Sequence, residues 1–195
     1  SQFNGKHLFL RHVTRVAHYL RTKHGARPII WDDMLRGTDK MDLMEVNLGD
    51  MVDIMVWVYV EDIDHFIDSS TWHTYSHVFS SVWVASAFKG AFGERLFIPN
   101  LSRHHENHQM WLEVMRREAG PMASGKPIHF QGLVLTGWSR YDHFAVLCEL
   151  LPVAVPSLVR NLVTVTTGAV HSTAVVDRVH PLLKCPAAVP KLSAD

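Results

Sequence analysis

The stretch Pro28-Ile-Ile-Trp31 decides the fold class, because it is a short strand candidate without a polar residue. A continuously apolar strand is typical of parallel sheets, in which helices cover both faces. Further strand candidates follow at Met51–Val58, Val82–Ala85 and Gly132–Gly137. The sequence therefore predicts an α/β protein with four parallel strands.

Helical segments separate these strand candidates. Apolar residues spaced as on one helix face run over about residues 6–24, and Gly25 marks the end of that helix. Further helices are expected at about 61–77, from Ser102 to Arg117, and at about 143–151 and 156–166. No two strands are joined by a tight Asn-Gly hairpin turn. The alternation thus predicts βα units with right-handed crossovers.

Two architectures contain such units, an open doubly wound sheet and part of a (β/α)₈ barrel. A full barrel takes roughly 250 residues, so four units make about half of one. We predict one α/β domain over residues 1–168 and an irregular tail over 169–195, where the alternation fails. The first residues contain neither an initiator Met nor the apolar core of a signal peptide. We therefore expect the chain to begin within a longer protein.

The composition argues against several classes of partner. The 195 residues are 47% hydrophobic and 19% charged, and the net charge is zero because Lys+Arg and Asp+Glu are 19 each. This balance does not favour nucleic acid or an anionic membrane surface. No apolar run reaches the roughly 20 residues of a membrane span. The two cysteines, Cys148 and Cys185, form no CxxC pair and suit a reducing compartment.

Tryptophan residues recur near the expected strand ends. Trp31, Trp57 and Trp83 end or lie in the first three strands, and Trp138 follows the fourth. Ligands of parallel α/β folds bind at the carboxyl ends of the strands. The C–H faces of a sugar ring stack on indole, so the four residues indicate a sugar pocket. The alternative is that they pack the strands against helices in the core.

Polar residues accompany the first two indoles. Asp32 and Asp33 are neighbours in an extended segment, so one can face the pocket while the other caps a helix or pairs with Arg. They do not make a general acid–base pair, because such a pair flanks the scissile bond from two sides. Tyr59 shares a side with Trp57, where its phenol either binds a substrate carbonyl or joins an aromatic ladder.

Two further polar groups leave alternatives open. Arg140 and Tyr141 follow Trp138, and Arg140 either binds hydroxyl groups or pairs with Asp142. His104 and His108 have i, i+4 spacing, but the HExxH pattern and a third ligand are absent. We predict a solvated helix N-terminus there and no metal. A competing hypothesis is an unrelated open α/β enzyme that binds a metal through the paired aspartates and these histidines.

Several segments together resemble the β-N-acetylhexosaminidases of glycoside hydrolase family 20. In chain order, the matching stretches are Arg27–Arg36, Trp83–Ala91, Asn107–Trp111, Leu135–Phe144 and Cys148–Pro152. The resemblance covers about residues 5–168 and implies a TIM barrel. Residues 27–137 would supply strands five to eight, the C-terminal half of that barrel.

The resemblance also implies a mechanism. Family members use the 2-acetamido carbonyl of the substrate as the nucleophile, oriented by an Asp, while the adjacent Glu acts as acid and base. They are therefore exceptions to the two-carboxylate scheme. The Asp-Glu pair ends strand four, which would precede Ser1, and no Asp-Glu dipeptide occurs in this chain. We expect a hydrolase of N-acetylgalactosaminides or N-acetylglucosaminides without a cofactor, whose catalytic residues lie outside this chain. The alternative is an inactive, truncated sugar-binding or scaffold product.

The residues expected to bind substrate come from the resemblance and from the strand-end pattern. Trp31, Trp57 and Trp138 match the indoles of the −1 pocket, and Tyr59 is the candidate for the acetamido contact. The full set is Trp31, Asp32, Trp57, Tyr59, Trp83, Trp138, Arg140 and Tyr141. Lysosomal members have Trp-x-Glu where this chain has Trp138-Ser-Arg140, a departure that fits a nucleocytoplasmic branch. We therefore expect a cytoplasmic and nuclear protein, and a homodimer if the edges of a half barrel pair.

Overall fold

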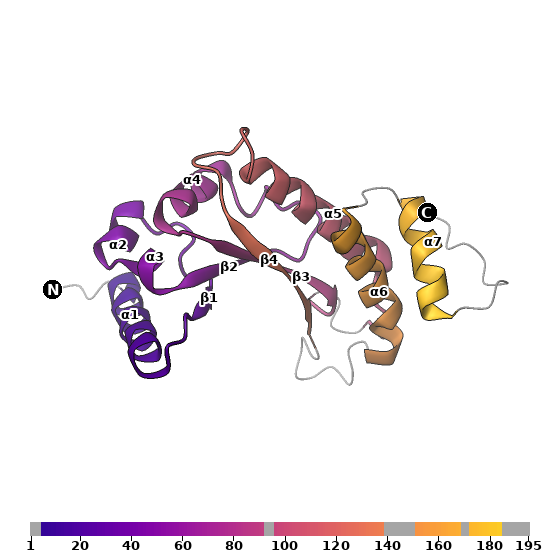
Figure 1. The fold of residues 1–195 in the computed structure, drawn as a ribbon, viewed down its shortest axis with the longest axis horizontal. Coiled ribbons are helices and arrows are strands. Elements are labelled where there is room, and N and C mark those ends of the chain that lie inside the picture. The colour runs from indigo at the N-terminus through magenta and orange to yellow at the C-terminus, as the bar shows by residue number, and fades with distance from the viewer. Residues whose placement is uncertain (1–4, 92–95, 139–150, 169–171, 185–195) are drawn as a thin grey trace. The chain divides into compact units, whose positions relative to one another are not determined.

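The structure is a computed structural model that describes residues 5–91, 96–138, 151–168 and 172–184. Figure 1 shows helices alternating with the strands of one sheet. The elements are α1 (Gly5–His24), β1 (Ile29–Trp31), α2 (Lys40–Glu45), α3 (Leu48–Met51), β2 (Asp53–Trp57), α4 (Ser69–Val78), β3 (Val82–Lys89), α5 (Leu101–Glu118), β4 (Phe130–Gly137), α6 (Leu151–Thr167) and α7 (Ser172–Leu183).

The four strands form one parallel sheet in the order β1-β2-β3-β4. Trp31 of β1 is in register with Met55 of β2, which is in register with Trp83 of β3. Strands β3 and β4 are also parallel. Val82 N at the start of β3 donates to the carbonyl of His129, which precedes β4. Trp138 N, which follows β4, donates to the carbonyl of Lys89 at the end of β3. The predicted α/β class and parallel sheet are confirmed.

Strands β1 and β2 are more buried on one face than on the other, whereas β3 is buried on both faces along most of its length. Ile54, Val56 and Val82 are fully buried, as expected for a face packed beneath helices. Residues in the alternate positions are more open, since Ile29 is 44% and Trp31 41% exposed. The prediction that β1 is covered on both faces is therefore wrong. One face of this sheet edge is packed, and the other retains exposed apolar side chains.

The chain divides into two compact units. The first unit comprises Ser1–Trp57, Asp64–Ala85 and Val114–Val134, and the second comprises Val58–Ile63, Ser86–Glu113 and Leu135–Asp195.

In the first unit, α3 packs against α1 and α2, and α2 packs against α4. The helices α2 and α3 were not predicted, because 6 and 4 residues are too few to show a helical period. Helix α4 begins later than expected, since the Asp68 carboxylate caps it by accepting from Thr71 N at 2.8 Å.

In the second unit, α6 and α7 pack together through Val163, Val175 and Val179 (Figure 1). The predicted irregular tail over 169–195 is therefore wrong for residues 172–183, where valines four residues apart form an apolar stripe. Helix α6 begins at Leu151, earlier than the helix expected at about 156–166, and Pro156 lies inside it. The helix expected at about 143–151 falls almost entirely outside the described residues.

Candidate functional site

A turn after β1 builds the best-defined polar cluster of the first unit. The carbonyl of Asp32 accepts from Leu35 N at 2.7 Å and from Arg36 N at 3.1 Å. This turn returns the Arg36 side chain to the Asp32 carboxylate. Asp32 and Arg36, together with Trp57 at the end of β2 and Tyr75 of α4, are called the Asp32 cluster below.

The Asp32 carboxylate is fully buried and accepts from four donors. Arg36 binds it with two parallel bonds, from Nη2 to Oδ1 and from Nε to Oδ2, both 2.7 Å long. Trp57 N reaches Oδ1 at 3.4 Å, and Tyr75 Oη reaches Oδ2 at 3.1 Å. Paired, multiply hydrogen-bonded geometry is what a buried charge requires. The carboxylate is thus enclosed and held by protein donors, and the expected contact of Asp32 with a ligand stays a prediction.

Asp33 takes the opposite orientation. Its side chain is exposed, and Oδ1 accepts from Trp57 Nε1 at 3.3 Å. The two acids therefore point to different sides, although they lie in the turn after β1 and not in the extended segment that the sequence predicted. Asp33 is the acid that faces outward, beside the Trp57 indole.

Burial and charge set the proton states within the cluster. Burial raises the pKa of the Asp32 carboxyl, and the hydrogen bonds and charge of Arg36 oppose that rise. Burial and the neighbouring Asp32 charge raise the pKa of the Tyr75 hydroxyl well above its usual range. Tyr75 is therefore protonated at neutral pH, and its hydroxyl donates a hydrogen bond to Asp32.

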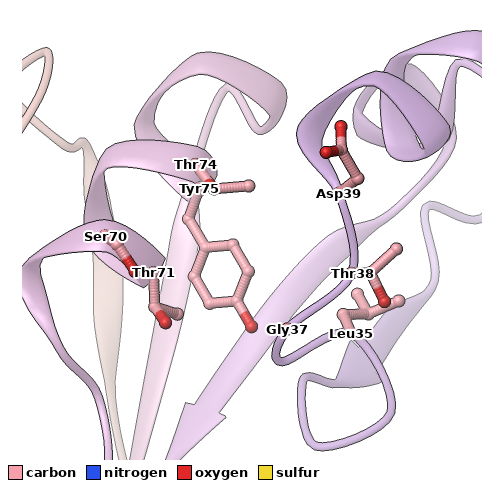
Figure 2. A pocket seen from close by; sticks show the side chains of 8 residues that line it. All are labelled: Leu35, Gly37, Thr38, Asp39, Ser70, Thr71, Thr74 and Tyr75. Atoms are coloured by element: carbon pink, nitrogen blue, oxygen red, sulfur yellow. The ribbon is translucent and has the colours of Figure 1, made fainter.

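Tyr75 also lines a polar cavity of about 220 Å³ between α4 and the loop that follows β1 (Figure 2). The other lining residues are Leu35, Gly37, Thr38, Asp39, Ser70, Thr71 and Thr74. None of them carries a positive charge, and four bear aliphatic hydroxyl groups. The cavity is smaller than a typical ligand pocket of roughly 300 Å³ or more.

The second unit contains a separate aromatic pair. The rings of Tyr59 and Trp138 meet edge to face, with centroids 6.0 Å apart, and Trp138 is 41% exposed. Trp138 follows β4 directly, and its carbonyl accepts from Lys89 Nζ. Gly90 has a φ of +70°, and a Cβ placed there would lie 2.6 Å from the Cβ of Trp138. The position of Trp138 thus depends on a close approach that only glycine allows.

The loop that carries Tyr59 is held by α5. Asn107 Nδ2 donates to the carbonyls of Val58 at 3.0 Å and Val60 at 2.6 Å, and Trp111 Nε1 donates to Val58 O at 3.0 Å. Asn107 and Trp111 are fully buried. These contacts place the Tyr59 ring through the main chain on either side of it.

Trp83 does not lie where the sequence predicted. Strand β3 runs from Val82 to Lys89, so Trp83 is its second residue, whereas Trp31 and Trp57 are the last residues of β1 and β2. A Cβ at Gly132 would come within 3.1 Å of the Trp83 ring. Trp83 therefore packs against β4 at the amino end of the strand. Arg140 and Tyr141 lie outside the described residues.

The histidines of α5 are buried, which corrects the prediction of a solvated helix N-terminus. We call His104, His105 and His108 the histidine cluster. His108 Nε2 lies 2.7 Å from Ser86 Oγ, and His105 Nδ1 lies 3.2 Å from Thr164 Oγ1 of α6. Burial lowers the pKa of each of the three to about 4, so they are neutral at pH 7.

Two features are absent from the described residues, and both absences bear on the competing predictions. No group of three or more His, Cys, Asp or Glu side chains in that part of the chain is arranged to hold a metal ion. None of the helices that the structure describes combines the length and the apolar composition of a membrane span.

Sequence reasoning missed Arg36, Tyr75 and Lys89. The i, i+4 spacing of Asp32 and Arg36 could have revealed the first, because such pairs meet on one helical turn. Tyr75 lies 43 residues from its partner Asp32, and Lys89 lies 49 residues from its partner Trp138. No local sequence pattern predicts contacts over such separations.

Known proteins resemble this chain over most of its length. Human hexosaminidase D is 39% identical over 163 residues, which cover 83% of this chain. Hexosaminidase D from Bos taurus is also 39% identical, over 153 residues and 77% of the chain. The chain is a relative of hexosaminidase D. It spans only 32% of the human and 42% of the bovine hexosaminidase D. No family model matches the chain.

Proposed function

We propose that the chain is the sugar-binding portion of a β-N-acetylhexosaminidase of glycoside hydrolase family 20, formed by about strands five to eight of a TIM barrel. The 39% identity to hexosaminidase D over 83% of the chain carries this proposal. Four parallel strands in sequential order agree with consecutive strands of a barrel. The open side of β1 and β2 would then belong to the barrel interior.

The substrate in this proposal is a terminal N-acetylgalactosamine or N-acetylglucosamine residue. Trp31 and Trp57 end β1 and β2, and Trp138 follows β4, so each indole is at the carboxyl end of a strand, where barrels bind ligands. Indole faces suit the C–H faces of a pyranose, and the Tyr59 hydroxyl suits the acetamido carbonyl. The amino-end position of Trp83 weighs against a direct role, while Arg140 and Tyr141 stay predictions.

Hydrolysis in this proposal follows the substrate-assisted route. The acetamido oxygen attacks the anomeric carbon, the bond to the leaving oxygen breaks, and an acid donates a proton to that oxygen. Water then attacks the anomeric carbon of the cyclic intermediate, the bond to the acetamido oxygen breaks, and the same residue, now a base, takes the proton of the water. The acid and the residue that orients the acetamido group are the Asp-Glu pair of the family, which this chain does not contain. The residues present here bind and orient the sugar, so the isolated chain is proposed to hold it without cleaving it.

A second candidate function is a truncated product that binds sugar or serves as a scaffold. Either candidate accounts for the absence of an Asp-Glu dipeptide from these 195 residues. A cytoplasmic and nuclear location and a homodimer remain predictions for either candidate.

The test is a titration of the purified chain with N-acetylgalactosamine and N-acetylglucosamine, followed by tryptophan fluorescence. We expect a saturable change at millimolar sugar or below, and a weaker response to galactose and glucose, which lack the acetamido group. No response to either N-acetyl sugar overturns the binding role. Hydrolysis is tested on the complete gene product with aryl N-acetyl-β-hexosaminides, where inactivity favours the scaffold alternative.

A further inference from the structure

We propose that Asp32 and Arg36 form a clamp that sets the position and the ring plane of the Trp57 indole. Asp32 is then a positioning residue for sugar binding that does not itself touch the sugar. This inference rests on the proposed sugar-binding function, because it assigns Trp57 a ligand. All the residues involved lie in the first unit.

The carboxylate of Asp32 has no acceptor position left for a sugar hydroxyl. A carboxylate offers about four lone-pair sites, and here each oxygen receives two donors. Oδ1 accepts from Arg36 and from the Trp57 main chain, and Oδ2 accepts from Arg36 and Tyr75. The side chain is also 0% exposed. A hydroxyl could bind Asp32 only by displacing a protein donor.

The same contacts converge on Trp57. Its N–H donates to Asp32 at 3.4 Å, and its carbonyl accepts from Arg36 Nη2 at 2.6 Å. The guanidinium carbon of Arg36 lies 5.0 Å from the centroid of the indole ring, within the range of a cation–π contact. The indole N–H donates to Asp33. Both main-chain polar groups, one ring face and the ring nitrogen of Trp57 are thus held from the turn after β1.

A fixed indole favours binding because the ring then loses little freedom when a sugar stacks on it. Arg36 has the geometry for this role, since its planar fork binds the carboxylate with two bonds and stacks on an aromatic face at the same time. Lysine has neither property. Tyr75 completes the clamp from α4 by fixing the carboxylate oxygen that faces away from Trp57 N.

The first unit contains a matched control. Asp53, the first residue of β2, is 8% exposed and accepts from Arg27 Nε at 2.7 Å and from Ser81 Oγ at 2.9 Å. It is also a buried aspartate paired with an arginine, but it lies at the opposite end of the strand from Trp57. Asp32→Asn, beside the last residue of β2, and Asp53→Asn, at its first residue, therefore make the same chemical change near opposite ends of that strand.

The experiment uses the complete chain labelled with 5-fluorotryptophan. The chain contains six tryptophans, and each gives its own ¹⁹F signal. Trp57→Phe identifies the Trp57 signal. In the absence of sugar we expect Asp32→Asn to shift or broaden that signal, and Asp53→Asn to leave it in place. In a titration with N-acetylgalactosamine and N-acetylglucosamine, Asp32→Asn should raise Kd roughly tenfold, because small displacements of positioning groups have large effects. Asp53→Asn should change Kd by less than about twofold.

Milder variants keep the test decisive if Asp32→Asn does not fold. Arg36→Lys retains the charge but loses the fork and the ring contact, and Tyr75→Phe removes one hydrogen bond to Asp32. We expect both to shift the Trp57 signal, Arg36→Lys more strongly. An unchanged Trp57 signal in the folded variants overturns the clamp. So does a raised Kd with an unchanged sugar-free signal, since that result means direct contact with the sugar.

Failure of the proposed function gives a different result. If the unaltered chain shows no response to either N-acetyl sugar, the sugar-binding role fails. The Trp57 ¹⁹F signals of the variants without sugar still test whether Asp32 and Arg36 position Trp57.

Discussion

The Asp32 cluster and the histidine cluster both bury polar side chains, but the charge states of those side chains differ. Asp32 remains hydrogen-bonded in an ion pair, because Arg36 supplies two parallel bonds to its carboxylate. The histidines of α5 are neutral at pH 7, since burial lowers their pKa to about 4. The first cluster ends at Trp57, a half-buried indole at a strand end, whereas all three histidines are enclosed.

The difference indicates distinct roles. A buried ion pair is costly unless it is fully hydrogen-bonded, and it adds little stability over an apolar substitute. Its presence beside a half-buried indole is better explained by positioning than by stability. Neutral histidines that join α5 to Ser86 of β3 and to Thr164 of α6 are explained by packing of the second unit alone. Acid and single substitutions separate these roles.

Acid should destabilise the chain through the histidine cluster. The folded pKa values of about 4 lie below the unfolded value near 6.5, so the unfolded state binds more protons between these pH values. The stabilisation is complete above pH 6.5 and is lost as pH falls toward 4, by up to roughly 3 kcal/mol for each histidine. Asp32, whose pKa burial raises, acts in the opposite direction but is a single group.

Urea unfolding at pH 7.0, 6.0 and 5.0 measures this loss. The control is a chain in which His105 and His108 are replaced by Gln, which does not titrate, and its stability should depend less on pH. Equal pH dependence in the two proteins would exclude the histidines as the cause.

Asp32→Ala should lower the free energy of unfolding by about 3–5 kcal/mol, because it leaves Arg36 partly buried without its counter-charge. The change should also disturb the Trp57 ¹⁹F signal. Chemical denaturation at pH 7 gives the free energy. Asp53→Ala serves as the comparison, since it should reduce stability without altering Trp57. A loss below about 1 kcal/mol for Asp32→Ala would show that the ion pair is dispensable.

Gly90→Ala should destabilise the second unit by about 1–3 kcal/mol. The residue has a left-handed backbone conformation, and the added methyl group would meet the Trp138 side chain and carbonyl at 2.6 Å. The Trp138 fluorescence should change, while the Trp57 ¹⁹F signal stays in place. Gly25→Ala is the control, because Gly25 has a similar φ of +62° and an added Cβ would meet open space there. Equal losses in both variants would mean that backbone strain, and not contact with Trp138, is responsible.

Tyr75→Phe should have the smallest effect, about 1 kcal/mol, because it removes one hydrogen bond to Asp32 and keeps the ring that packs on Trp72 and Phe79. Thermal unfolding followed by circular dichroism detects such a change. A much larger loss would show that the Tyr75 hydroxyl is essential to the ion pair.

The sequence by itself determined the fold class, the parallel sheet and the strand-end positions of Trp31, Trp57 and Trp138. These features are local, since apolar runs and their spacing along the chain predict strands and helices directly. The i, i+4 relation of Asp32 and Arg36 was also present in the sequence, although its meaning was not evident.

Only the tertiary structure decided which of the neighbouring acids is enclosed, where Trp83 lies on its strand, and whether the histidines of α5 meet water. Each answer depends on partners distant in sequence: Tyr75 for Asp32, Gly132 for Trp83, and Ser86 and Thr164 for the histidines. Burial is a property of the packed chain, so the same Asp or His is a candidate ligand contact when exposed and a structural group when enclosed.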